Sequence, residues 1–282
     1  MKTMNFKTGA TRTVAAGCLV GLMMAAQSAA ACTLSNWSAA VGLNETDASL
    51  GTIAPGAPNP AAPDEVLSPR YSGRCAMAAS GQGYVEDVSP GGIDRIRARF
   101  YVLANNSTDA VIYRGFDGNG SGSELFNLQI AADGAVLITS GSISIPAPGA
   151  AVEPGWNSVE IDWNSGGAFG LIINGQSVAT SGFSATGSLA SVRLGNLNGA
   201  TGTLNFDAYE SRRSTEIGRL CVGDADNSGG RGLGDLQAIF AEFQFGMLAS
   251  GQPDADENGS VGLGDLQTVF EIFQFGTPAC PT

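Results

Sequence analysis

The chain has 282 residues and a formal net charge of −12, with 26 acidic residues, 14 basic residues and no histidine. So acidic a chain is poorly suited to nucleic acid, because affinity for phosphates depends on lysine and arginine. A nucleophilic triad is also hard to assemble without histidine as the base.

Residues 1–31 have the features of a secretory signal peptide. Three basic residues and no acid precede an apolar run over residues 14–26, and alanines at 29–31 offer a cleavage site. The run is too short to span a bilayer comfortably, which disfavours a membrane anchor. Lipoprotein cleavage before Cys32 is a further alternative. We expect a secreted or cell-surface protein without a transmembrane segment, whose mature net charge is −15 after loss of the three basic residues.

Four cysteines remain after the signal peptide, and they allow three disulfide pairings. We predict the pairs Cys32–Cys75 and Cys221–Cys280, because the second pair brackets a repeated unit near the C-terminus. The alternatives are free thiols or a zinc site. Zinc is disfavoured since the chain has neither a CxxC motif nor a histidine.

The region 32–219 is predicted to be a β-domain, with an irregular, proline-rich surface segment at 51–69. Apolar and polar residues alternate in four stretches beyond Cys75, which is typical of antiparallel strands with one buried face. The alternating apolar residues are Ile96, Ala98 and Phe100; Phe126, Leu128 and Ile130; Val159, Ile161 and Trp163; and Leu204, Phe206 and Ala208. Asp133-Gly134 and Asn174-Gly175 predict hairpin turns. Many short strands separated by turns favour an antiparallel β-sandwich.

The order of these stretches resembles the concanavalin A-like lectin/glucanase jelly roll, in particular its laminin G-like members. A strand beginning at Trp156 precedes a hairpin over 170–176, and a late strand ends in Phe206-Asp207. The resemblance covers roughly residues 70 to 215. It implies a domain that binds glycans or another surface ligand.

Glu160 and Asp162 are the candidates for catalysis in this domain. The glycosidases of the superfamily carry a third acid on the same strand, but positions 164 and 165 here are Asn and Ser. Glycoside hydrolysis usually needs two carboxylates that flank the scissile bond. The two side chains point to one side of a strand, and a solvated outer face is the simpler interpretation. We therefore predict no enzymatic activity, with glycoside hydrolase as the alternative.

The region 220–282 contains a sequence that is written twice, with a constant offset of 30 residues. Each copy has oxygen-bearing side chains at positions 1, 3, 5 and 12 of a loop, a glycine at position 6, and a backbone carbonyl expected at position 7. This is the ligand order of an EF-hand calcium loop. The predicted calcium ligands are Asp224, Asp226, Ser228, Gly230 and Asp235 in the first copy, and Asp254, Asp256, Asn258, Ser260 and Asp265 in the second.

A helix is predicted after each loop, because apolar residues then recur at helical spacing until Gly246 and Gly276. These loop–helix copies resemble a type I dockerin module, which implies two bound calcium ions and a cohesin-like or other protein partner. Position 8 of the first loop, Arg231, and the Leu-Gly pairs at positions 10 and 11 differ from the pattern of that family.

The expected protein is thus an exported, calcium-binding β-sandwich with a small helical module for assembly or attachment. A non-catalytic glycan- or surface-binding role is the first hypothesis. A glycoside hydrolase or an accessory subunit of polysaccharide degradation is the second, and a structural cell-surface protein is the third.

Overall fold

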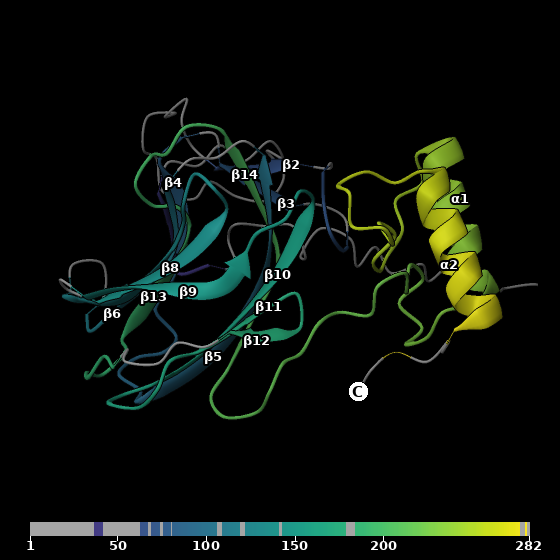
Figure 1. The fold of residues 1–282 in the computed structure, drawn as a ribbon. Coiled ribbons are helices and arrows are strands. Elements are labelled where there is room, and N and C mark those ends of the chain that lie inside the picture. The colour runs from purple at the N-terminus through teal and green to yellow at the C-terminus, as the bar shows by residue number, and fades with distance from the viewer. Residues whose placement is uncertain are drawn as a thin grey trace, which may run out of the picture.

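The computed structural model describes residues 37–41, 63–66, 69–73, 76–79, 81–105, 109–118, 122–140, 143–178, 184–276 and 280. Two antiparallel sheets face each other, and a pair of helices follows at the C-terminal end (Figure 1). The prediction of a β-sandwich followed by a small helical module is confirmed. The predicted signal peptide and the pair Cys32–Cys75 lie outside the described residues.

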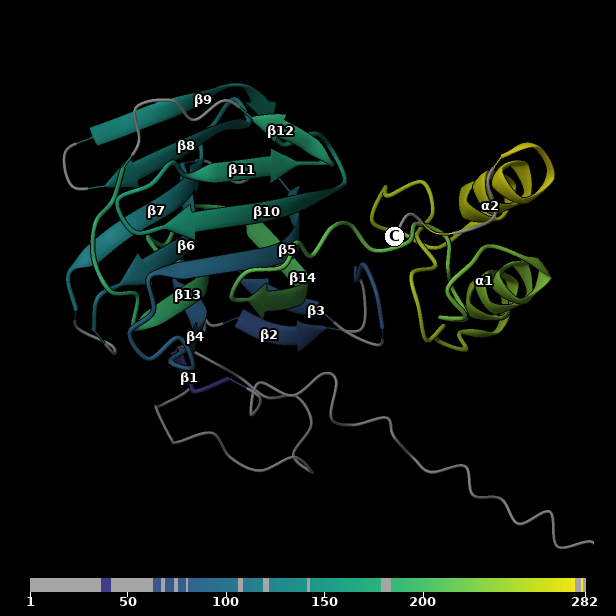
Figure 2. The same ribbon diagram turned by 90° about the horizontal axis from the view of Figure 1, so that it is seen from below.

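Among the described residues, each sheet has seven strands. Hydrogen-bonded neighbours run antiparallel (Figure 2). The first sheet has the order β1 (Ala39–Val41), β4 (Gly83–Asp87), β13 (Ser191–Asn196), β6 (Ala110–Phe116), β7 (Glu124–Ile130), β8 (Ala135–Ser140) and β9 (Ile143–Ala151). The second has the order β12 (Gln176–Val178), β11 (Gly170–Ile173), β10 (Trp156–Asn164), β5 (Arg95–Asn105), β14 (Thr203–Arg212), β3 (Ala76–Ala79) and β2 (Pro63–Val66).

Strand β2 corrects one expectation, because part of the proline-rich segment is not irregular. Residues 63–66 pair with Ala76–Ala79 of β3 at the edge of the second sheet. Pro63 is the first residue of this edge strand, a position where a missing N–H leaves the sheet intact. Proline content alone therefore did not exclude a strand here.

The main core lies between the two sheets and is built from the predicted alternation. Ile96, Phe100, Phe126 and Trp163 are all at most 1% exposed and belong to one buried cluster. The rings of Phe126 and Trp163, from opposite sheets, lie with centroids 5.7 Å apart. Aromatic side chains dominate such a core because each one removes a large apolar area from water.

Both predicted hairpin turns are present. Asn174 and Gly175 have positive φ angles of 51° and 78° and join β11 to β12, which is the two-residue geometry that Asn-Gly favours. Ala208 lies within β14 as predicted, but the predicted alternation fails there, because a bulge shifts the register between Asp207 and Glu210. Ala208 has a φ of 50° and packs outside the second sheet rather than in the main core.

A second apolar cluster covers the outer face of the second sheet. It consists of Tyr71, Ala76, Tyr101, Leu103 and Trp156, all buried. The rings of Tyr71 and Tyr101 are stacked with centroids 3.6 Å apart. Apolar residues on the outer side of a sheet need a cover, and the C-terminal module supplies part of it, as described below.

The C-terminal module contains the helices α1 (Leu233–Phe245) and α2 (Leu263–Phe275), which confirms the predicted helices. Their common core is small and consists of Ala225, Ile239, Ala249, Ala255 and Val269. A disulfide joins Cys221 to Cys280 and closes the module across 59 residues, as predicted. Within the described residues, no helix is long and apolar enough to cross a membrane.

Candidate metal centres and the helical face

The two repeated loops form two clusters of carboxylates. In the first loop (residues 224–235), oxygens of Asp224, Asp226 and Asp235 lie within 4.8 Å of one another. In the second loop (residues 254–265), Asp254, Asp256 and Asp265 do the same. The structure thus brings together the carboxylates at positions 1, 3 and 12 in both copies.

The hydrogen bonds that shape the second loop centre on two buried aspartates. Asp254 accepts the backbone N–H groups of Asn258 at 3.0 Å and Gly259 at 2.8 Å. Asp265 accepts the N–H groups of Asp256 at 3.1 Å and Gly262 at 2.7 Å, and the last of these bonds caps the start of α2. Position 12 therefore ties the loop to its helix.

The first loop repeats this pattern atom for atom. Asp224 accepts Ser228 and Gly229 at 2.9 and 3.0 Å, and Asp235 accepts the N–H of Asp226 at 3.0 Å. The glycines at position 6, Gly229 and Gly259, have φ angles of 88° and 95°, a region that L side chains disfavour. Two copies with one geometry indicate one common chemistry.

The neutral ligands predicted at positions 5 and 7 are arranged less uniformly. Asn258 Oδ1 accepts the N–H of Ser260 at 2.9 Å and its hydroxyl at 2.6 Å. The Ser228 hydroxyl donates to Asp226, and this bond is the largest effect that lowers the pKa of Asp226. Gly230 lies at position 7 of the first loop, where a backbone carbonyl would be the ligand.

The donor set fits a hard cation. The gathered side chains offer carboxylate and amide or hydroxyl oxygens, and Ca²⁺ prefers such ligands in flexible geometry. Burial raises the pKa of Asp224, Asp235 and Asp265, because removal from water penalises the charged form. A bound divalent cation would offset this penalty and the repulsion among the three carboxylates.

The pKa of Asp254 is raised to about 8, first by burial and then by the charges of Asp265 and Asp256. Without a bound ion, Asp254 would therefore hold a proton at neutral pH, and a bound cation would displace it. We expect calcium affinity to rise from about pH 6 to about pH 9 and binding at neutral pH to release a proton. Without calcium, the folded module should lose stability from about pH 4 to about pH 8, since unfolded Asp254 ionises near its ordinary pKa.

Titration calorimetry in two buffers with different ionisation heats measures this proton release. The Asp254→Asn variant is the control, because it has no proton to lose at that position. Equal binding heats in both buffers for the unaltered protein would contradict the raised pKa of Asp254.

Sequence reasoning missed the role of the glycines at position 11. A Cβ atom on Gly234 would lie 2.1 Å from Asp226 Oδ2, and one on Gly264 would lie 2.5 Å from Asp256 Oδ2. These glycines leave room for the position-3 carboxylate above the first turn of each helix. The difference at position 11 from the dockerin pattern was the available signal, but the carboxylate that these glycines accommodate is visible only in three dimensions.

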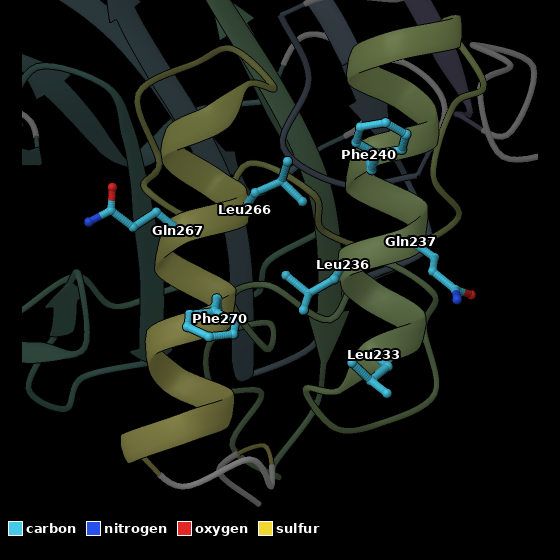
Figure 3. A pocket seen from close by; sticks show the side chains of 7 residues that line it. All are labelled: Leu233, Leu236, Gln237, Phe240, Leu266, Gln267 and Phe270. Atoms are coloured by element: carbon cyan, nitrogen blue, oxygen red, sulfur yellow. The ribbon is translucent and has the colours of Figure 1, made fainter.

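The helices leave a broad apolar surface uncovered. Leu236 and Leu266 point toward each other between α1 and α2, whereas Gln237 and Gln267 point away on the outer sides (Figure 3). Together with Leu233, Phe240 and Phe270 they line a groove of about 640 Å³. Phe240 and Phe270 are 47% and 49% exposed, so much of the predicted apolar stripe faces outward. We call this surface the helical face.

Glu160 and Asp162 lie on β10, both on the outer side of the second sheet and away from the main core. The Glu160 carboxylate accepts the N–H groups of Ile217 at 3.2 Å and Gly218 at 3.1 Å, and Glu160 is only 7% exposed. The simpler expectation of a solvated face is wrong for Glu160, because the segment leading to the module covers it.

Asp162 is engaged by two arginines. Arg95 donates to it at 3.1 and 2.8 Å, and Arg97 pairs with it at 2.8 Å. A hollow of about 170 Å³ beside Glu160 is smaller than the roughly 300–1,000 Å³ of common ligand pockets. Both carboxylates are thus engaged by groups of the chain itself.

No protein-family model matches this chain, and no curated protein sequence matches it significantly. Solved structures share the sandwich architecture. The cellulose-induced protein Cip1 aligns over 56% of this chain and 87% of its own, with 13% identity and a TM-score of 0.46. A carbohydrate esterase of the Shiga toxin-encoding bacteriophage phi24B aligns over 54% and 87%, with 14% identity and a TM-score of 0.40.

A sialidase also aligns, over 54% of this chain but only 17% of its own, with 13% identity and a TM-score of 0.40. The names of these neighbours describe proteins that act on carbohydrates or are induced by one. Their TM-scores lie below 0.5 and their identities below 25%, so the likeness concerns the fold alone.

Proposed function

We propose that this is an exported calcium-binding protein in which a non-catalytic sandwich binds a glycan or a cell-surface ligand. In this proposal, the C-terminal module holds two calcium ions and serves assembly or attachment. The observation that carries it is the pair of matched loops, each with three carboxylates within 4.8 Å and the same backbone hydrogen bonds. In each copy, the aspartates at positions 1 and 12 are buried and hydrogen-bonded in the same way, which a surface that is merely acidic does not require.

Attachment through the module is supported by the helical face. None of the described residues that line its groove is charged, although the module has nine acidic residues and Arg231 as its single basic residue between 220 and 282. A protein partner with an apolar ridge flanked by basic side chains would match both features. The loop–helix repeats resemble a type I dockerin, so a cohesin-like protein is one candidate.

The non-catalytic part of the proposal is supported by Glu160 and Asp162, whose carboxylates bind the chain's own backbone and arginines. We propose a glycan ligand because the sequence resembles lectin-like jelly rolls. Fold alone does not imply function, so the ligand is tested directly below. A glycoside hydrolase or an accessory subunit of polysaccharide degradation remains the second candidate, and a structural surface protein the third.

A glycan array followed by a hydrolysis screen tests the sandwich. We expect the full chain to retain one class of polysaccharide without releasing reducing sugar. Glu160→Gln should bind like the unaltered protein and lose about 1–3 kcal/mol of stability, because one charged acceptor of two N–H groups is removed.

The matched control is Glu271→Gln, which removes the same charge from an exposed position on α2. Reducing-sugar release that disappears in Glu160→Gln but persists in Glu271→Gln would establish the hydrolase instead. An array without any retained glycan would favour the structural role.

A further inference from the structure

The two loops are nearly identical, but the second one is attached to the sandwich. The backbone carbonyl of Glu257 accepts the N–H of Trp156 at 2.8 Å. The Glu257 carboxylate accepts the Tyr71 hydroxyl at 2.7 Å and forms an ion pair with Arg219. The sandwich thus binds Glu257 through both its main chain and its side chain, and Arg219, in the segment that leads from the sandwich to the module, binds its side chain as well.

Glu257 occupies position 4 of the second loop, between Asp256 and Asn258, which are predicted ligands. Its φ angle of 58° matches the 59° of Asn227, the residue at position 4 of the first loop. The two residues have the same backbone conformation, but only Glu257 has a charge that can pair with Arg219 and accept from Tyr71. Only the second copy of the repeat therefore has the residue that makes this attachment.

The sandwich side of this contact is buried and closely packed. Tyr71 and Trp156 are 0% and 3% exposed and belong to the apolar cluster on the outer face of the second sheet. A Cβ atom on Gly155 would lie 2.4 Å from the Glu257 carbonyl oxygen, and one on Gly259 would lie 3.2 Å from Leu103 Cδ2. The glycines allow the second loop to approach the sandwich directly.

Two further contacts hold other parts of the module. The N–H of Gly73 donates to the Gly251 carbonyl at 3.0 Å, and buried Arg70 pairs with Glu242 of α1.

Asp207 holds the segment that contains Tyr71, because its carboxylate accepts the N–H groups of Tyr71 at 2.7 Å and Ser72 at 2.8 Å. The module is seated by residues from sequence-distant parts of the sandwich.

We propose that calcium binding in the second loop and docking of the module on the sandwich are coupled, with Glu257, Tyr71 and Arg219 as positioning residues. This inference rests on the proposed calcium function. Docking fixes the conformation of residue 257, and hence of the ligands on both sides of it, before the ion arrives. By linkage, the bound ion stabilises the docked arrangement by the same free energy. Calcium then sets the direction in which the helical face points relative to the sandwich.

The Arg219→Gln variant separates this coupling from simple electrostatics. Removing a positive charge beside an acidic loop should tighten calcium binding if only Coulomb forces act. Coupling predicts weaker calcium binding instead, because the variant loses the ion pair that holds Glu257 in place. We expect a loss of about fivefold in calcium affinity of the second loop, at the lower end of usual coupling energies.

The measurement is calcium titration calorimetry of the full chain in an Asp235→Asn background, where the first loop lacks its position-12 carboxylate. The reciprocal background, Asp265→Asn, reports the first loop, whose affinity should not change. Arg213→Gln is the matched control, since Arg213 is exposed and donates to the Ser89 carbonyl at 2.9 Å. Tyr71→Phe is a second, charge-neutral variant that should weaken the second loop in the same direction.

An unchanged or tightened second loop in both Arg219→Gln and Tyr71→Phe would overturn the coupling while leaving the calcium proposal intact. Equal weakening of both loops would also overturn it, because the effect would then not depend on the contact with Glu257. If the full chain binds no calcium in either loop, the coupling and the proposed function fail together.

Discussion

Removal of calcium by a chelator is expected to unfold the C-terminal module while the sandwich stays folded. Asp254 and Asp265 are at most 1% exposed, and each loop brings three carboxyl groups together, so without an ion their burial and the charge of those that ionise oppose folding. The apolar core that must offset this cost contains three alanines, Ile239 and Val269. An ion present at a thousand times its dissociation constant adds about 4 kcal/mol to the free energy of unfolding. The stability lost with two ions is therefore larger than the stability that so small a core provides.

Calorimetry and far-ultraviolet circular dichroism of the full chain test this result. Two transitions are expected with calcium, and chelator should abolish the one that carries the helical signal. Asp265→Ala should weaken the second loop most, because position 12 supplies a ligand and caps α2. The second loop should also bind more tightly than the first, since Asn258 offers a carbonyl oxygen where Ser228 offers a hydroxyl.

Magnesium at the same concentration is the control, because it demands a tight octahedron and keeps its waters. Unchanged helicity and melting in chelator would remove the basis for both calcium sites. Full protection by magnesium would point to a general charge effect rather than to a calcium site.

Loss of the Cys221–Cys280 disulfide is expected to destabilise the module by roughly 4 kcal/mol. The bond closes a stretch with a sequence separation of 59, and the chain-entropy model assigns about this value to such a loop. Cys280 Sγ also lies 4.0 Å from Asp224 Oδ2, so the first loop should lose calcium affinity as well. The second loop is held by the sandwich and should be less affected.

The double variant Cys221→Ser and Cys280→Ser, melted at saturating calcium, measures this effect. Mild reduction of the unaltered protein should lower the melting temperature of the module equally. Mass spectrometry of the non-reduced protein shows the bond directly and also tests the predicted pair Cys32–Cys75. A peptide that joins the sandwich to the module by a disulfide would contradict both pairings.

The sequence alone determined the local features whose cause lies within a few residues. Asn174-Gly175 specifies its turn because both residues tolerate positive φ. The repeated aspartates and the glycine at position 6 predict the loops, since a carboxylate at position 1 can reach the N–H groups four and five residues later. Alternation placed Trp163 in the core because side chains on a strand have a period of two.

The tertiary structure decided which faces of the helices and strands are buried and which are exposed to solvent. The helical spacing predicts that Ile239 and Phe240 both lie on the apolar face of α1, but only Ile239 is buried. Two short helices cannot cover the whole width of that apolar face. Glu160 has the pattern of an exposed strand residue and is buried by a segment more than fifty residues further along the chain. The repeat makes the two loops look alike, and only the sandwich, which packs against Glu257, makes the second loop different from the first.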